Sequence, residues 1–327
     1  MKALVTGATG FIGANLVREL LHDGIETRVI IRKESDTRNI DRLDIDIAYG
    51  DLRDAHSLVS ALKGCTLLFH VAAFYTLWLP DRRVIYEINV EGTKNILGAA
   101  LEEGVERVVY TSTVGTIGFP KDRLGSEEDF PSPEELVNDY KRSKWIAEVE
   151  ALKLCQKGLP LVVVNPTAPV GPRDIKPTPT GQVIVDFLSR KIPGYVETGL
   201  NVVDVEDVAR GHILAAQKGK IGERYILGHQ NLSLKEIFLL LEEITGLPAP
   251  TLRIPYRIAL VAGYLNEALS KMTGIPPRVP LDGVKMAKKF MYVDSSKAVK
   301  ELELPQSSVK GALEKAVSWF KEHGYMR

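Results

Sequence analysis

Apolar residues recur with two alternating spacings along the first 165 positions of this chain. Short apolar runs rich in β-branched residues predict strands at Lys2–Thr6, Glu26–Arg32, Asp46–Tyr49, Thr66–Val71, Arg107–Thr111 and Leu161–Asn165. Between them, apolar residues at three- and four-residue spacing predict helices at Ala14–His22, Ala55–Leu62, Ile85–Glu103 and Ser132–Gln156. This alternation is typical of an α/β fold whose parallel sheet is covered by helices on both faces.

The pattern changes after Pro166. Prolines break the segment from 166 to 179, and two more proline-rich stretches interrupt helical segments near 248–255 and 276–280. One further strand and helix are expected at Val202–Gln217. We therefore predict a sheet domain over residues 1–165, to which 202–217 returns, and a smaller C-terminal lobe made of 166–201 and 218–327.

A glycine loop, which includes Phe11 and Ile12, joins the first strand to the first helix. Gly7 permits a tight turn, Gly10 lets the backbone approach a pyrophosphate, and Gly13 lets the helix pack close to the sheet. The N-terminus of the helix also favours the phosphate charge. The loop therefore predicts a Rossmann-type, doubly wound parallel sheet that binds a dinucleotide, and it makes the C-terminal lobe the substrate-binding lobe.

The end of the second strand indicates which nicotinamide cofactor binds. An acidic residue there commonly holds the ribose 2′-hydroxyl, but this chain has Arg32. A guanidinium pairs with a 2′-phosphate, so the sequence favours NADP(H) over NAD(H); the alternative for Arg32 is a solvated strand-end charge. Asp51 and Leu52 follow the third strand, where the carboxylate could accept a hydrogen bond from the adenine or cap the helix beginning near Asp54.

A second group of residues points to proton transfer. Tyr140 and Lys144 are four apart on a predicted helix, so the ammonium is expected beside the phenol. A nearby cation favours the phenolate, and we expect it to lower the pKa of Tyr140. Such a tyrosine can give or take a proton near neutral pH.

Composition excludes several classes of function. The 327 residues carry 42 Lys+Arg and 42 Asp+Glu, so no net field draws in nucleic acid or an anionic membrane. Cys65 and Cys155 lie far apart, which indicates reduced core cysteines of a cytoplasmic protein and no metal site. The first strand starts at residue 2, so no signal peptide is expected. The apolar run Ile258–Leu269 is too short to span a bilayer, and it fits either an amphipathic surface or a substrate wall.

Taken together, these motifs resemble those of the extended short-chain dehydrogenase/reductases, over essentially the whole chain. The resemblance rests on the glycine loop at 6–13, His70–Ala73, Asn89–Thr93 and the Tyr140/Lys144 pair. Within that family the chain is most similar to dihydroflavonol-reductase-like proteins. The segment Ala168–Gly181 also resembles hopanoid-associated sugar epimerases.

The resemblance implies a role for each matching residue. It makes Tyr140 the general acid/base, Lys144 the residue that holds the nicotinamide ribose, Thr113 the catalytic hydroxyl, and Asn89 the support of the active-site helix. Most members carry serine where this chain has Thr113, and Ser112 is a weaker candidate for that role. Besides the glycine loop, the expected cofactor contacts are Val71, Ala72, Ala73, Thr111, Pro166, Thr167 and Val170.

Other residues have a structural interpretation beside the functional one. His70 ends a buried strand, and we interpret it as a core histidine with satisfied hydrogen bonds. Tyr75, Trp78 and Tyr86 could line an apolar pocket or close the core. Asp174 and Lys176 could contact the substrate or lie in a solvated loop.

Three functions compete. The first is an NADP(H)-dependent reductase of a ketone or aldehyde, with Tyr140 as general acid and Thr113 polarising the carbonyl oxygen. The second is a sugar epimerase or dehydratase with tightly bound NAD(P)+, and the third is a non-catalytic dinucleotide sensor. Family members that bind nucleotide sugars carry arginines where this chain has Asn165 and Leu200, so we favour the reductase.

The resemblance also implies a homodimer. Its contact would form through the helices at Ile85–Glu103 and Ser132–Gln156, with apolar faces made of Ile96, Ala99, Ala100, Ile146, Val149 and Leu152. The alternative is that these faces only cover the sheet. The expected partner is a small carbonyl or sugar-type substrate; peripheral contact with a lipid substrate is compatible with the sequence, but no motif supports it.

Overall fold

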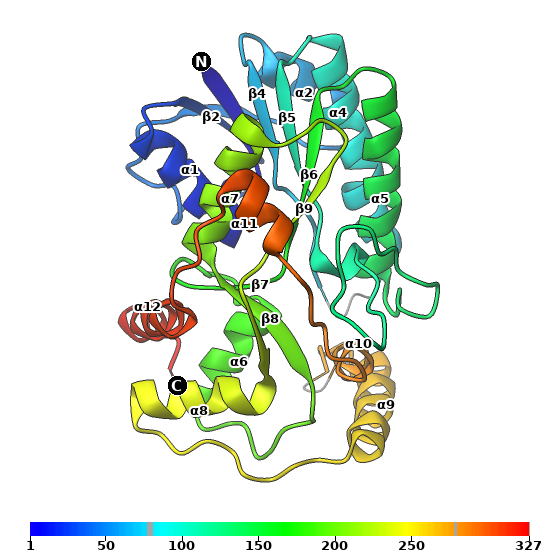
Figure 1. Ribbon diagram of the computed structural model, residues 1–327, viewed down its shortest axis with the longest axis vertical. Helices are drawn as coiled ribbons and strands as arrows, with labels where there is room; N and C mark the ends of the chain where they lie inside the picture. The colour runs from blue at the N-terminus through cyan, green and yellow to red at the C-terminus, as the bar shows by residue number, and fades with distance from the viewer. Residues whose placement is uncertain (77–80, 278–279, 327) are drawn as a thin grey trace.

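The computed structural model describes residues 1–76, 81–277 and 280–326. Seven parallel strands form the main sheet in the order β3-β2-β1-β4-β5-β6-β9 (Figure 1). They are β1 (Lys2–Thr6), β2 (Glu26–Ile31), β3 (Asp46–Tyr49), β4 (Leu67–His70), β5 (Arg107–Thr111), β6 (Leu161–Pro166) and β9 (Arg224–Leu227). The reversal of order between β1 and β4 creates a crevice at the carboxyl ends of the strands, as expected for a doubly wound sheet.

Helices cover both faces of the main sheet. One apolar core lies under α1 (Phe11–His22), α7 (Val205–Lys218) and α11 (Ser296–Leu302). The second lies under α2 (Ala55–Leu62), α4 (Gly92–Glu102) and α5 (Asp139–Gln156). Because helices cover both faces, all residues of β6 are buried, and the strand begins with the apolar run Leu161–Val164 instead of alternating apolar and polar residues.

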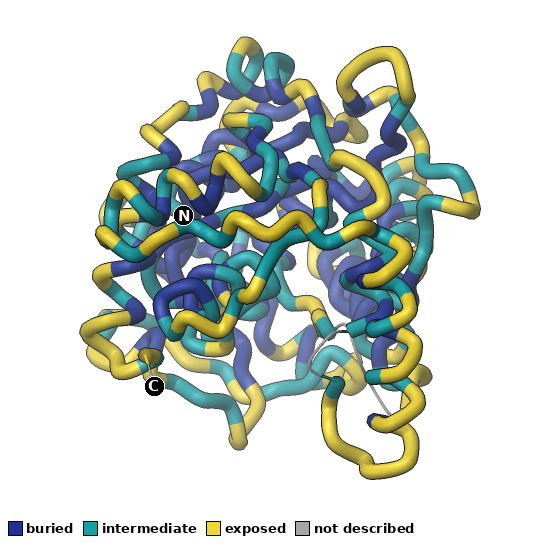
Figure 2. The backbone as a smooth tube through the Cα atoms, turned by 90° about the horizontal axis from the view of Figure 1, so that it is seen from below, coloured by how far each residue is buried: buried dark blue, intermediate teal, exposed yellow. Residues whose placement is uncertain are grey.

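The smaller lobe lies at the carboxyl ends of the sheet strands (Figure 1). Its three-stranded sheet has the order β10-β8-β7, and the helices α6, α8 and α12 pack around a separate apolar core. The elements are β7 (Ala168–Val170), α6 (Pro179–Leu188), β8 (Gly199–Asp204), β10 (Gln230–Ser233), α8 (Leu234–Thr245), α9 (Tyr256–Thr273), α10 (Leu281–Met286) and α12 (Val309–Glu322). Figure 2 shows buried backbone through the interior and exposed backbone at the periphery.

The division of the chain differs from the predicted boundaries in two places. Residues 218–327 were assigned to the lobe, but β9 within this range pairs with β6 as the edge strand of the main sheet. Residues 202–217 were expected to return to the sheet domain, and α7 does so, whereas β8 belongs to the three-stranded sheet. The residues of β9 follow the first lobe segments in the chain, and only the pairing with β6 places them in the main sheet.

Two predicted helices also differ in detail. The helix expected from Ser132 begins at Asp139, because Asn138 caps it by accepting a hydrogen bond from the Lys141 N–H at 2.8 Å. The helix expected over Ile85–Glu103 is α3 (Arg83–Tyr86), one π-helical turn (Glu87–Glu91) and α4.

The expected dimer face on α4 is wrong. Ile96, Ala99 and Ala100 are at most 5% exposed in the single chain, because they pack under α4 against the sheet. On α5, Ile146 is exposed, whereas Leu152 packs against the same core. Val149 is half-buried, so Ile146 is the exposed residue of the predicted face.

Candidate functional site

The glycine loop has the geometry that the sequence predicts. Gly7 has a φ of 72°, in the left-handed region, and a Cβ there would lie 2.7 Å from the Ala72 backbone. A Cβ on Gly13 would collide with the carbonyl of Gly7. Gly10 is exposed and begins α1 without a side-chain cap, so the first turn keeps its N–H groups available for a phosphate. Phe11 and Ile12 form that first turn, and the loop fits a dinucleotide.

The turn after β4 lies against this loop through Val71 and Ala72, whose backbone atoms touch Gly7. The Ala72 N–H donates to Thr6 Oγ1 at 3.1 Å, and the Thr6 hydroxyl also bonds His70 Nδ1 at 2.8 Å. His70 is fully buried, its Nε2 lies 3.0 Å from Thr93 Oγ1, and burial lowers its pKa to about 3. His70 is therefore a neutral core histidine, as predicted, that supports the turn at Ala73.

At the far end of the crevice, β2 and β3 present Arg32 and Asp51. Arg32 is exposed, and its backbone N–H donates to Ser35 Oγ. The Asp51 carboxylate accepts from the Arg53 guanidinium, which holds the pKa of Asp51 at about 2. The helix α2 is capped by Asp54, so Asp51 is not its cap. Leu52 packs beside Gly92 at the start of α4.

Tyr140 lies in the first turn of α5 and contacts the same cavity as Thr113. Burial raises the pKa of Tyr140 to about 12, opposed by a hydrogen bond with the Thr113 side chain. The lowering by Lys144 that the sequence predicted is wrong, because loss of water around the phenol dominates. A neutral phenol is the form that can donate a proton. The Tyr75 ring packs on it, with ring centroids 4.2 Å apart.

Lys144 is one turn further along the same face of α5 and is 1% exposed. Its ammonium donates to the Thr111 carbonyl oxygen at 2.7 Å and lies 4.5 Å from the centre of the Tyr110 ring. Burial lowers the pKa of Lys144 to about 7, and the Glu148 carboxylate opposes this shift. The Thr111 hydroxyl in turn bonds His212 Nε2 at 2.9 Å.

Asn89 joins this helix to the cofactor turn. Its amide donates to Ser143 Oγ at 2.9 Å and to the Phe74 carbonyl at 3.0 Å, and its Oδ1 accepts from the Phe74 N–H at 2.7 Å. The Ser143 hydroxyl donates to the Tyr140 carbonyl at 2.8 Å. Asn89 lies in the single π-helical turn, a distortion often found at functional sites, so it supports the segment that carries Tyr140.

The sequence analysis missed a buried ionic group behind these residues. Glu148 is 0% exposed, and its Oε1 lies 2.9 Å from Nε of Arg224, which comes from β9. Its Oε2 accepts from Ser112, Thr116 and Asn165. Ser112 also lines the cavity, but its hydroxyl donates to Glu148, so Thr113 is the better placed of the two neighbouring hydroxyls. In the sequence, Tyr140, Lys144 and Glu148 follow one another at intervals of four residues. Only this spacing could have indicated that Glu148 lies on the same helix face as the other two.

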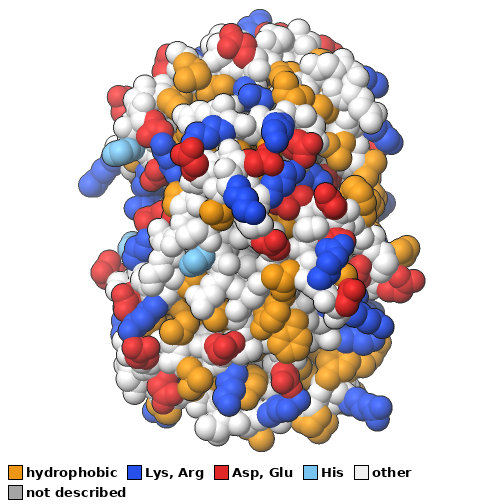
Figure 3. All heavy atoms as spheres, viewed as in Figure 1, with side chains coloured by type: hydrophobic (Ala, Val, Ile, Leu, Met, Phe, Trp, Pro, Cys, Tyr) orange, Lys and Arg blue, Asp and Glu red, His pale blue; other side chains and the backbone are white. Residues whose placement is uncertain are grey.

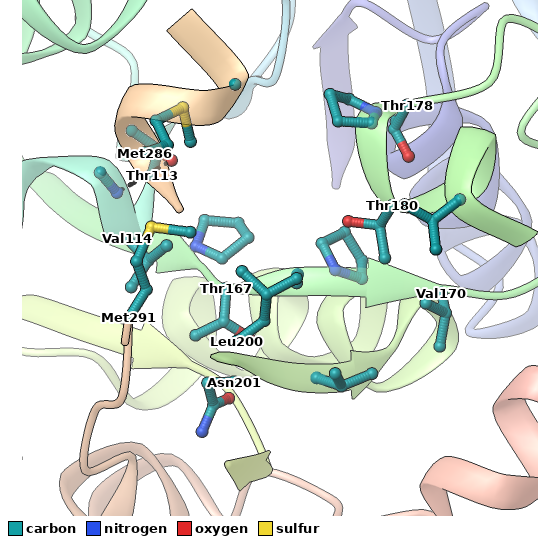
Figure 4. A pocket seen from close by; sticks show the side chains of 18 of the residues that line it. Thr113, Val114, Thr167, Val170, Thr178, Thr180, Leu200, Asn201, Met286 and Met291 are labelled. Atoms are coloured by element: carbon teal, nitrogen blue, oxygen red, sulfur yellow. Dashed lines mark hydrogen bonds between the residues drawn. The ribbon is translucent and has the colours of Figure 1, made fainter. Parts of the chain in front are cut away.

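The cavity between the domain and the lobe encloses about 380 Å³. Thr113, Val114, Met286 and Met291 lie on one side and Val170, Thr178 and Thr180 on the other, with Thr167 and Leu200 between them (Figure 4). Ile12, Pro166, Thr167 and Val170 share this cavity with Tyr140, so four of the expected cofactor residues meet the expected general acid/base here. Most of the lining side chains are apolar, and Leu200, at the position where the resemblance to nucleotide-sugar enzymes would imply an arginine, is one of them.

Several alternatives are now decided. Tyr75 lines the cavity, and Tyr86 donates to Asp139 Oδ1 at 2.9 Å outside it, while Trp78 lies outside the described residues.

Asp174 is not in a solvated loop: it is 2% exposed and accepts from Thr178 at the start of α6, where burial raises its pKa to about 6. Lys176 is exposed.

Comparison with known proteins decides the family. The model of the NAD dependent epimerase/dehydratase family matches residues 3–228. The chain belongs to this family. It is 52% identical to a Synechocystis sp. protein provisionally named dihydroflavonol 4-reductase, over 99% of this chain and 95% of that one. It is also 37% identical to sterol demethylase protein B of Methylococcus capsulatus, over 99% of both chains. The crystal structure of gox2253 superposes with a TM-score of 0.88 at 46% identity, covering 99% of each chain.

The membership agrees with the fold, since the main sheet and the glycine loop are those of an extended short-chain dehydrogenase/reductase. Family members are oxidoreductases and epimerases that use a nicotinamide dinucleotide. Within the described ranges, no helix is both long and apolar enough to cross a membrane.

Proposed function

We propose that this protein is an NADP(H)-dependent reductase of an apolar ketone or aldehyde, with Tyr140 as the general acid. The observation that carries the proposal is a neutral Tyr140 beside the Thr113 hydroxyl at the wall of an apolar cavity. The names of the Synechocystis and Methylococcus relatives, a reductase and a sterol-processing protein, support a carbonyl compound of this kind.

The residues divide the reaction between them. When bound, NADPH supplies the hydride that the carbonyl carbon accepts. Tyr140 gives its proton to the carbonyl oxygen, and the Thr113 hydroxyl donates a hydrogen bond that polarises the same oxygen. Lys144, released from the Thr111 carbonyl, would hold the nicotinamide ribose and stabilise the phenolate that remains. The product is an alcohol, and Tyr140 regains its proton from solvent.

Arg32 supports NADP(H) as the cofactor. It is exposed at the end of β2, and no carboxylate of the described residues forms an ion pair with it, so its guanidinium is available to a 2′-phosphate. Asp51, whose pKa Arg32 also helps to lower, is already paired with Arg53.

A redox-neutral sugar epimerase with tightly held NAD(P)+ is the second candidate. The family description favours it, but the apolar lining of the cavity disfavours a sugar, whose hydroxyls need hydrogen-bonding partners. A non-catalytic sensor is disfavoured because Thr113, Tyr140 and Lys144 are all present. We further propose a cytoplasmic protein that forms a homodimer through the exposed part of α5 around Ile146.

The experiment begins with denaturation of the purified protein and mass spectrometry of any released dinucleotide. The protein is then titrated with NADPH and NADH, alongside the variants Arg32→Ser and Lys33→Ser. We expect an empty site that prefers NADPH, a preference lost in Arg32→Ser and kept in Lys33→Ser, and NADPH oxidation with apolar ketones. Stoichiometric NAD+ in the preparation with no NADPH oxidation would instead establish the epimerase.

A further inference from the structure

Lys141 is a buried cation at the substrate cavity, and the reaction above does not use it. The residue follows Tyr140 on α5 and is 5% exposed. Its side chain lines the cavity and packs against Gly115, between Met291 and the Phe119 ring. A lysine in this place brings a charge into a cavity whose other walls are mostly apolar.

The Lys141 ammonium has weak partners only. Its Nζ lies 3.9 Å from Met291 Sδ and 5.6 Å from the centre of the Phe119 ring. No carboxylate of residues 1–76, 81–277 and 280–326 forms an ion pair with it, since Glu135 is held by Lys289 at 2.8 Å. Burial lowers the pKa of Lys141 to about 8, which still leaves the amine mostly protonated at neutral pH.

The other two buried cations of the site are matched by oxygen atoms. Lys144 bonds the Thr111 carbonyl, and Arg224 pairs with Glu148 and donates to two further carbonyls. A buried ammonium without such an acceptor is costly, and a ligand carboxylate would remove that cost by forming a charge-assisted hydrogen bond in a medium of low dielectric constant.

We propose that Lys141 binds a carboxylate carried by an otherwise apolar substrate, and so fixes its orientation against Tyr140. This deepens the proposed function, because it gives the carbonyl substrate one acidic group. The rest of the lining, including Val114, Leu200 and Met286, would take the hydrocarbon body.

The test uses two probes that differ only in the head group, decanoate and decan-1-ol, and measures their dissociation constants by isothermal titration calorimetry. We expect the wild-type protein to bind decanoate about tenfold or more tightly than decan-1-ol, a difference typical of one charge-assisted contact. Lys141→Met should erase the preference, Lys141→Arg should keep most of it, and Lys300→Met, at an exposed lysine on α11, should leave it unchanged.

Equal binding of the two probes by the wild type, or a preference that survives in Lys141→Met, would overturn the proposal. Circular dichroism of each variant confirms that it is folded. Binding is measured without turnover, so the preference can be established even if the protein reduces no ketone, and reductase activity can be present without the preference.

A second inference rests on α9, which presents large apolar side chains to solvent. Its buried residues are small, namely Ala259, Gly263 and Ser270, and Gly263 faces Leu281 and Val284 of α10. Its outer face carries Ile258, Val261, Leu265, Leu269 and Met272, which are 59–85% exposed. Figure 3 shows hydrophobic side chains at the lower right of the molecule, where Figure 1 draws α9. Such a stripe is far larger than the scattered exposed leucines of an ordinary surface.

The charges around this stripe are mainly basic. Arg257 and Lys288 form no ion pair within the described residues, and Lys271 is matched by Glu267 at 3.1 Å. Lys285 lies over the Tyr264 ring beside the half-buried Asp282. The local charge is therefore positive although the whole chain is neutral. α10 packs on the inner face of α9 and supplies Gly283 and Met286 to the substrate cavity, so one helix separates the stripe from the site.

We infer that the α9 stripe docks on an anionic lipid bilayer, from which an apolar substrate can reach the cavity. Basic residues beside an exposed apolar helix face are the pattern of interfacial helices. This inference does not need the Lys141 contact.

Vesicle flotation tests it. With vesicles of phosphatidylcholine and phosphatidylglycerol we expect the protein to float, and with phosphatidylcholine alone to float much less. Leu265→Ser/Leu269→Ser should abolish flotation, while Leu239→Ser, an exposed leucine on α8, should not change it. Absence of flotation, or equal flotation of the double variant, would overturn the inference. So would light scattering that shows a dimer lost in the double variant, because a second copy would then cover the stripe.

Discussion

The helices α5 and α9 each have 18 residues, and they distribute polarity in opposite ways. α5 buries Lys141, Ser143, Lys144 and Glu148 against the sheet domain while Ile146 faces solvent. α9 fully buries only small residues and exposes Leu265 and Leu269. Neither helix shows the usual arrangement of apolar residues inside and polar residues outside.

The difference shows which side chains of each helix the stability of the fold requires. A buried polar group costs stability unless it is matched. On α5, Lys144 is matched by the Thr111 carbonyl of β5, and Glu148 is matched by the Asn165 amide of β6 and the Arg224 guanidinium of β9. An exposed leucine costs little stability, so nothing in the fold requires the outer face of α9. We therefore expect substitutions on α5 to alter catalysis and folding, and those on the outer face of α9 to alter neither.

The largest expected effect is on turnover. Tyr140→Phe removes the proton donor and should lower kcat about 10²–10⁴-fold, the usual contribution of a general acid. The dissociation constant for NADPH should change little, because the ring remains. Tyr86→Phe is the matched control, since that hydroxyl bonds Asp139 outside the cavity. Steady-state kinetics and fluorescence titration check both values; activity retained in Tyr140→Phe would exclude it as the acid.

The next effect is on stability. Arg224→Met leaves Glu148 buried without its partner and should lower the free energy of unfolding by about 3–5 kcal/mol. Glu148→Leu/Arg224→Met removes both charges and should restore part of the loss. The control is Lys153→Met, which breaks an exposed pair with Glu150 and should cost at most about 1 kcal/mol. Urea denaturation measures the free energy of unfolding of the three variants. Equal losses of stability in Arg224→Met and Lys153→Met would contradict a buried ion pair.

A third effect follows from buried titrating groups. Burial lowers the pKa of His70 to about 3 and that of His212 to about 4, so below about pH 6.5 only the unfolded chain binds these protons. Stability present above pH 6.5 is therefore lost as the pH falls. Asp174 has the opposite effect on the free energy of unfolding, because its raised pKa lets the folded state bind a proton from about pH 6.

We expect a net loss of about 2 kcal/mol between pH 7 and pH 5. Urea denaturation across this range measures it. His212→Gln should reduce the loss, whereas His22→Gln should not, since the side chain of His22 is 85% exposed. A free energy of unfolding that does not change with pH, or that rises on acidification, would refute the assignment of neutral buried histidines.

Much of the sheet domain could be predicted, because the sequence patterns that specify its strands and helices are local. The glycine loop and the apolar runs of β1, β2 and β5 each specify an element without reference to distant residues. The spacing of Tyr140 and Lys144 likewise specified one helix face. Their relative placement, and that of Thr113, then followed from the rule that ligands bind at the carboxyl ends of parallel strands.

What was missed depends on contacts between distant segments. Arg224 stands at the start of β9. Its role could not be inferred from the sequence, because it contacts Glu148 only when β9 pairs with β6. The pKa of Tyr140 was predicted with the wrong sign because burial, a tertiary property, outweighs a neighbouring lysine. Lys141 was passed over for the same reason, since its sequence position does not say that it is buried.

The smallest expected effect is on the outer face of α9. Leu265→Ser should change the free energy of unfolding by less than about 0.5 kcal/mol, because that side chain is 66% exposed and loses little burial. On the inner face, a Cβ at Gly263 would lie 3.2 Å from Leu281 Cδ1 and 3.3 Å from its Cα. Gly263→Val should therefore cost about 1–3 kcal/mol through overpacking against α10. Urea denaturation of the two variants compares the faces directly. A larger loss in Leu265→Ser than in Gly263→Val would mean that the apolar stripe is covered in the folded protein.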